Sequence, residues 1–234
     1  QLENYEPHGC STRTWLRKTA KHEAGHTLLL WLLDRCVAGV LVNENGGLTR
    51  SGTIGEDEML PSPLLLHALA GMVMSCDREV VFDLRDHVDN KEYFHMDSDS
   101  RFAAEIVCCF DALPTLVFAH HVQVLTRFRT RFRKPYNELV ALLLQGKHLV
   151  DFKQAYELFG RWDLEFGFDK CPKSDFVMRA LARELKWKVP KCGWIGWDLN
   201  PLASWEYKRP TLIEVAMKIK EQMDTLCGKH SGGP

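Results

Sequence analysis

The chain has 234 residues, of which 45% are hydrophobic and 26% are charged, and its formal net charge is −1. This composition is typical of a globular protein with a sizeable core, and it provides no general electric field to recruit nucleic acid or an anionic membrane. No apolar run is long enough to span a bilayer and no secretory signal is recognisable, so we expect no membrane segment and no nucleic-acid partner. The eight cysteines form no C-x-x-C pair and several lie in apolar helical sequence, which indicates buried thiols in the cytoplasm or another reducing compartment.

Ser11 or Thr12 can cap the first predicted helix, which runs to about Arg35 and has apolar residues recurring along one side. Two runs rich in β-branched residues follow, at 37–43 and 47–54, and the Asn-Gly between them predicts a β-hairpin. A second helix is predicted at 61–82. Further helices are predicted at 100–110, 115–133, from 136 onward, and at 150–159, 174–187 and 210–227, with Pro135 ending the long helix before it.

These elements predict a mainly α fold of the α+β type, with a small β-hairpin or sheet beside the first helix. We divide the chain into residues 1–148, which carry the motif described next, and residues 149–234. The second segment is expected to be a helical, aromatic-rich extension packed on the first.

The motif H-E-x-x-H occupies residues 22–26, within the first predicted helix. Residues four apart lie on one face of a helix, so His22 and His26 can bind one zinc ion through their imidazole nitrogens. Glu23 projects to the side of this pair, where it can act as a general base toward a water that the metal activates. The alternative is a surface helix with incidental histidines, and the apolar residues on both sides of the motif weigh against it.

A catalytic zinc needs a third protein ligand, and no third histidine follows the motif at short range. The ligand must therefore come from a distant segment. Candidates gather in the stretch FHMDSDSRFAAEI, which supplies His95, Asp97 and Asp99. The residue types alone leave the choice among these three open.

Taken in order, the segments KHEAGHTLLLWLL, VAGVLVNENGGLTRSGTI, LLLHALAGMVMSCDREVVF and DSDSRFAAEIV resemble the protease domain of the FtsH family of zinc metallopeptidases. The resemblance covers about residues 12–145, and its most specific part is H-E-A-G-H followed at a distance by an aspartate. It implies that Asp99 is the third zinc ligand, because Asp99 matches the family aspartate that opens a later helix. It also implies a zinc-dependent endopeptidase in which Glu23 is the general base.

The chain departs from the family in several respects. It contains no G-x-x-x-x-G-K-[ST] motif of the family's AAA ATPase module, Lys21 stands where an apolar or aromatic residue is usual, and Ala104 replaces a common threonine. We therefore expect hydrolysis of accessible protein or peptide segments, or dependence on an ATPase or adaptor supplied in trans. An extended peptide substrate is expected to add to an open strand edge at residues 47–54, with a plain packing role for this hairpin as the alternative.

Two other functions compete with an active peptidase. One is a catalytically inactive, protease-like module that binds proteins, although a purely structural zinc site has no need of Glu23. The other is a regulatory peptidase of the ImmA/IrrE type, which also uses H-E-x-x-H. In that family the third ligand follows much sooner and is usually a glutamate.

Two further motifs are interpreted as structural. The basic and aromatic stretch RFRTRFRK, residues 127–134, splits its charges over two helix faces with Phe128 and Phe132 between them, so we expect a solvated helix anchored by these phenylalanines. His120 and His121 are adjacent and cannot face the same way on a helix.

Overall fold

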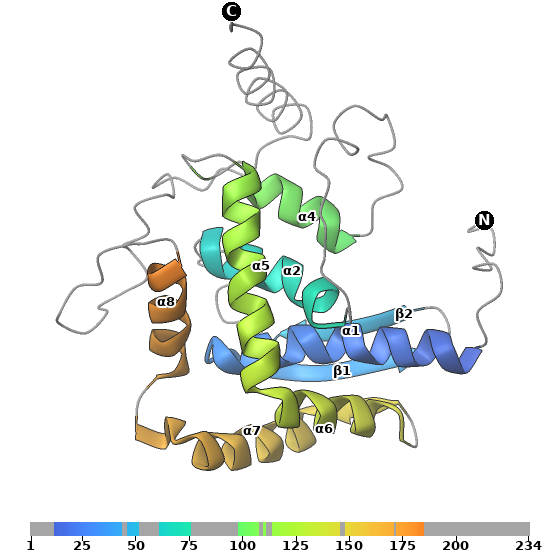
Figure 1. Ribbon diagram of the computed structural model, residues 1–234. Coiled ribbons are helices and arrows are strands. Elements are labelled where there is room, and N and C mark those ends of the chain that lie inside the picture. Colours follow the sequence, from blue (N-terminus) through green and yellow to red (C-terminus); the bar gives the residue numbers. More distant parts are fainter. Residues whose placement is uncertain are drawn as a thin grey trace, which may run out of the picture.

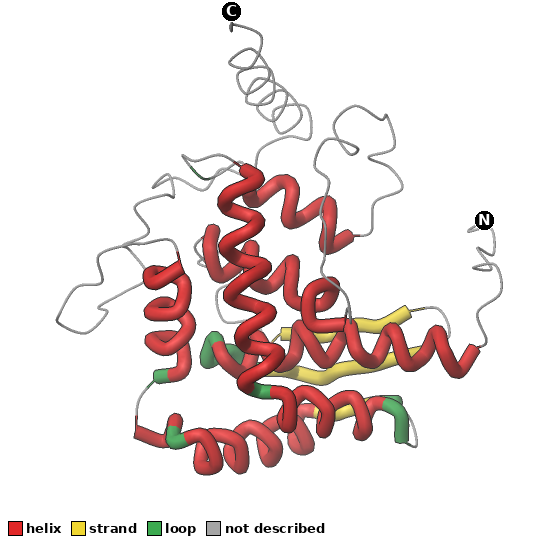
Figure 2. The backbone as a smooth tube through the Cα atoms, viewed as in Figure 1, coloured by secondary structure: helices red, strands yellow, loops and turns green. Residues whose placement is uncertain are grey.

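The protein is described by a computed structural model that covers residues 12–43, 46–51, 61–75, 98–107, 110, 114–145, 148–170 and 172–184. Helices make up most of these residues, and three short strands form one antiparallel sheet (Figure 2). The predicted fold class, mainly α with a small sheet beside the first helix, is confirmed at this level. Among the described residues, no helix is both long and apolar enough to cross a membrane.

The helix α1, Thr12–Leu32, contacts both the sheet and several of the other described helices. It packs against the hairpin of β1, Val37–Asn43, and β2, Gly46–Ser51, and also against α2, Pro61–Ser75 (Figure 1). The second half of α1 is almost completely shielded from solvent, since every residue from Glu23 to Leu33 is buried. The H-E-x-x-H motif therefore begins where the exposed half of the helix meets the buried half.

The sheet has the strand order β2-β1-β3, so β2 is an outer strand among the described residues. The third strand, β3 at Leu149–Asp151, pairs antiparallel with β1 and was not predicted, because the helix expected at 150–159 starts only at Phe152. Val40 and Val42 of β1 point into the core, and a register shift between Val37 and Gly39 lets Val37 point inward as well.

The remaining helices match the predicted order, with shifted ends. They are α4 (Ser98–Val107), α5 (Pro114–Arg131), α6 (Arg133–Leu143), α7 (Phe152–Phe166) and α8 (Lys173–Glu184), with a short 3-10 turn, η3, at Phe168–Lys170. The break after α5 falls at Phe132 rather than at Pro135. Pro135 lies in the first turn of α6, where a missing backbone N–H breaks no helical hydrogen bond.

The segments predicted at 76–82 and 210–227 lie outside the described residues. The division of the chain at residue 148 stays a prediction. On the later side of that point, β3 joins the sheet and α7 contacts β1. Cys36, the one cysteine in the described part of the chain, is exposed and not in a disulfide.

An aromatic cluster at the end of α1 ties the helix to the later part of the chain. The Trp31 ring makes edge contacts with Phe132 and Trp162, at centroid distances of 5.5 and 5.3 Å. Its indole N–H donates to Asp163 Oδ1 at 2.8 Å, so the polar atom of this buried ring has a partner. Phe128 and Phe132 are both buried, and so is His121, whose ring hydrogen-bonds to the Val117 carbonyl. Both motifs interpreted as structural therefore contribute to the core.

Lys173, at the start of α8, forms ion pairs beside this aromatic cluster. It is 9% exposed, and its Nζ lies 2.8 Å from Asp34 Oδ1 and 3.0 Å from Asp163 Oδ1. Burial alone would lower the pKa of Lys173, but the hydrogen bonds to the two aspartates outweigh burial and raise the pKa. The stabilisation is therefore present at neutral pH and is lost only in strong alkali, as the pH rises through the raised pKa.

We predict that Lys173→Met lowers the free energy of unfolding by about 2 kcal/mol, because two half-buried carboxylates lose their cation. The measurement is urea denaturation followed by circular dichroism. Lys134→Met is the control, since the Lys134 side chain is 71% exposed beside Glu165 and its loss should cost less than about 0.5 kcal/mol. Equal effects of the two substitutions would contradict the proposed role of Lys173.

Candidate metal centre

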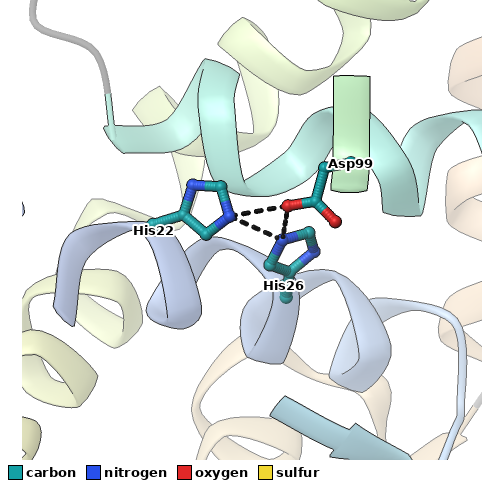
Figure 3. A group of neighbouring side chains, drawn as sticks. All are labelled: His22, His26 and Asp99. Carbon is teal, nitrogen blue, oxygen red and sulfur yellow. Dashed lines mark hydrogen bonds and ion pairs between the residues drawn. The ribbon is translucent and has the colours of Figure 1, made fainter. Parts of the chain in front are cut away.

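Three side chains from two distant segments converge on one point beside α1. His22 Nε2 lies 2.7 Å from Asp99 Oδ2, His26 Nε2 lies 3.0 Å from the same oxygen, and the two imidazole nitrogens are 3.1 Å apart. Figure 3 shows the two rings rising from α1 and the carboxylate approaching from the first turn of α4. Asp99 is 73 residues from His26 in the sequence, so the fold itself creates this cluster.

The geometry of the cluster suits a divalent cation. Donors that share one tetrahedral zinc at about 2.0–2.1 Å lie about 3.3 Å apart. The three distances observed are 2.7, 3.0 and 3.1 Å, so small outward shifts of these side chains would make room for the ion. Hydrogen bonds alone cannot satisfy all three contacts: if both imidazoles donate their Nε2 protons to Asp99, these two N–H groups face each other. A cation at the centre would accept all three lone pairs at once. His22, His26 and Asp99 therefore form a group that could hold a metal ion.

The cluster is closed on one side and open on the other. The His26 side chain is 6% exposed, whereas those of His22 and Asp99 are each 27% exposed. Burial alone would raise the pKa of Asp99, but hydrogen bonds from His22 and His26 outweigh it and lower the pKa below its usual value. Asp99 is therefore a carboxylate at neutral pH, as a ligand must be, and the open side leaves room for a further ligand.

Two glycines let α2 cross α1 directly over this cluster. A Cβ atom at Gly71 would lie 2.5 Å from Nε2 of both His22 and His26, so only a residue without a side chain fits there. A Cβ atom at Gly25 would lie 2.6 Å from the Ala70 carbonyl oxygen, so the backbone of α2 passes close to the motif helix at this glycine. Close backbone packing thus covers the inner side of the cluster.

A third histidine, His67 of α2, lies behind the cluster. Its ring centroid is 5.0 Å from that of His26, and burial, together with the nearby His26, lowers the pKa of His67 to about 3. His67 is therefore uncharged at neutral pH and adds no positive charge next to a bound cation. Within the described residues, neither His67 Nε2 nor His26 Nδ1 has a hydrogen-bond partner, and both atoms are shielded from solvent.

Glu23 points toward the sheet rather than into the three-residue cluster. Its Oε2 accepts a hydrogen bond of 2.7 Å from the Thr49 hydroxyl of β2. Thr49 and Gly47 are two residues apart and pair with the inward-facing Val40 and Val42, so both face α1. A Cβ atom at Gly47 would collide with the Glu23 side chain, which explains the glycine. Thr49 and Gly47 together fix the position of a buried carboxylate.

The structure thus brings together the predicted residues His22, His26 and Asp99, with Glu23 next to them on α1. The alternative ligands His95 and Asp97 lie outside the described residues. Gly71, His67 and Thr49 were not singled out from the sequence. Their roles depend on contacts between separate elements, and the one local signal was the pairing of the two hairpin strands, which places Thr49 opposite Val40.

Comparison of the chain with models of known protein families, with curated proteins and with solved structures finds no match. The resemblance to the FtsH metallopeptidases therefore stays a prediction that rests on the motifs and their order.

Proposed function

We propose that the protein is a zinc-dependent endopeptidase. His22, His26 and Asp99 would hold the zinc, because two imidazole nitrogens and one carboxylate oxygen form a common ligand set for this metal. When bound, zinc would polarise the scissile carbonyl and make the attacking water more acidic. The observation that carries the proposal is the convergence of three ligand atoms within 3.1 Å across 73 residues of chain.

Glu23 is proposed as the general base. The carboxylate would take a proton from the attacking water and return it to the leaving amine. Its hydrogen bond from Thr49 supports this role, because the bond occupies Oε2 and so orients the other carboxylate oxygen. The Thr27 hydroxyl also donates to the backbone carbonyl of Glu23, at 2.8 Å, which further fixes this residue.

The substrate is proposed to be an extended peptide that adds to β2 as a further strand. β2 is the outer strand of the described sheet, and Leu48 and Arg50 on its outward side are exposed. The same strand contacts Glu23 through Thr49. A peptide paired with β2 would thus lie against the strand that holds the proposed base, with main-chain hydrogen bonds providing affinity without strict sequence selection.

The proposal predicts one zinc per chain and hydrolysis of casein that stops on chelation and returns when zinc is added. Asp99→Ala should lose both the zinc and the hydrolysis, because two imidazoles alone hold zinc weakly. The measurements are elemental analysis of the purified protein and release of labelled peptides from casein. Circular dichroism shows whether the variant is folded.

Two outcomes would contradict the proposal. Stoichiometric zinc without hydrolysis of casein or short peptides would favour the inactive protein-binding module. Hydrolysis that continues unchanged after complete removal of the metal would exclude zinc from the reaction.

A further inference from the structure

A large groove with a strongly basic lining lies between α1 and the α5–α6 segment. Its volume is about 960 Å³. The charged residues that line it are all cationic: Arg13, Arg17 and Lys21 on α1, and Arg129 and Arg133 on the opposite wall. No carboxylate is present among the described lining residues. We call this feature the basic groove.

The basic groove accounts for two of the five basic residues in the motif RFRTRFRK. Arg127 forms an ion pair with Glu184 at 2.6 Å, Lys134 pairs with Glu165, and Arg131 lies over the Phe176 ring at 4.7 Å. These three residues belong to the face that packs toward α7 and α8. Arg129 and Arg133 belong to the other face and line the groove.

Several of the groove's cations are not neutralised by the protein. Arg13, Arg17 and Arg133 form no ion pair within the part of the chain that the structure describes, and all three are exposed. Like charges held close together repel, and an anionic ligand would relieve that repulsion. The walls themselves are fixed, since the Tyr136 hydroxyl of α6 donates to the Lys21 carbonyl of α1 at 3.1 Å.

The groove is separate from the metal centre. Arg13 and His22 are nine residues apart on α1, as are Arg17 and His26, and nine residues make about 2.5 helical turns. Arg13 and Arg17 therefore lie on the face of α1 opposite the two imidazoles, whereas Lys21 directly precedes His22. His22, Glu23, His26 and Asp99 are not among the residues that line the groove.

We propose that the basic groove binds an acidic polypeptide segment that carries aliphatic residues between its carboxylates. Arg13, Arg17 and Lys21 follow one another at about 6 Å along α1. In an extended peptide, every second side chain is on the same face, about 6.6 Å apart. Successive acidic side chains of such a peptide can therefore meet successive cations of the helix, while Arg129 and Arg133 face them from the other wall.

The uncharged lining favours a peptide over a nucleic acid. Leu16, Val140 and Leu144 give the groove an aliphatic surface that suits leucine or valine side chains. Single-stranded nucleic acid needs exposed aromatic rings on which its bases stack. The described lining residues include no phenylalanine or tryptophan: their rings are those of Tyr136, which is only 4% exposed, and of His148, which is partly buried.

The test is fluorescence anisotropy with a labelled peptide of alternating glutamate and leucine, about eight residues long, which is more than enough to span the roughly 12 Å between Arg13 and Lys21. We expect saturable binding that weakens strongly at about 0.5 M NaCl. The double variant Arg17→Ala/Arg133→Ala, which removes one cation from each wall, should weaken binding by about tenfold or more. Lys153→Ala/Arg179→Ala is the charge-matched control on exposed residues outside the groove and should bind like the wild type.

Three results would overturn the inference: no binding of the acidic peptide, equal loss in the control variant, or tighter binding of a single-stranded oligonucleotide of similar length. A peptide with lysine in place of glutamate should not bind. Peptide affinity should be unchanged in Glu23→Gln. A failure of the peptidase proposal would therefore leave this inference intact, and the reverse also holds.

Discussion

Glu23→Gln is expected to bind zinc as the wild type does and to lose peptide hydrolysis by a factor of about a hundred to ten thousand, the usual contribution of a general base. The amide has nearly the same shape as the carboxylate, and its oxygen can still accept the hydrogen bond from Thr49. What it cannot do is take a proton from water. The fold and the cluster of His22, His26 and Asp99 should therefore be undisturbed.

The measurements are kcat/KM on a labelled peptide and zinc content on the same preparation. Glu157→Gln is the matched control, because it makes the same chemical change at an exposed position of α7 and should leave both values unchanged. A Glu23→Gln variant as active as the wild type would end the hydrolase proposal. Loss of zinc from the Glu23→Gln variant would instead indicate that Glu23 is itself a zinc ligand.

Elements with a strong local pattern could be predicted from the sequence. β1 covers the predicted residues 37–43, because its valines and the following Asn-Gly mark both the strand and its turn. The approach of His22 to His26 also follows from local geometry, since residues four apart share a helix face. The start of α1 at Thr12 was predicted, and its end came three residues before the predicted end at Arg35.

Features that depend on contacts between distant segments could not be predicted in the same way. β3 has three residues, too few to show an alternating pattern, and its partner β1 lies about a hundred residues earlier. The basic groove needs α1 and the α5–α6 segment side by side, so neither stretch indicates it alone. Asp99 lies between these two cases. No periodicity in the sequence links it to His26, and it was selected only through the resemblance to the ordered motifs of the FtsH family.

Gly71→Ala is expected to weaken zinc binding by about a hundredfold, the upper range for residues that position metal ligands. The added methyl group would lie 2.5 Å from the Nε2 atoms of His22 and His26, the two atoms proposed to bind the metal. A movement of α2 away from α1 would relieve this clash but would also break the other packing contacts of α2. Ala70 lies against Gly25, and the buried Leu69 and Val73 anchor the same helix in the core.

The measurement is competition for zinc against a chelator of known affinity, together with urea denaturation of the metal-free protein. Gly160→Ala is the matched control: a Cβ atom at this exposed position of α7 meets nothing within 4 Å. It should keep full zinc affinity and gain up to about 1 kcal/mol of stability, since alanine is the better helix former. Alanine brings the same gain in helix propensity at residue 71 as at residue 160. The difference between the two variants therefore reports the steric effect of the added methyl group on the imidazoles. Wild-type zinc affinity in Gly71→Ala would show that the metal is bound elsewhere.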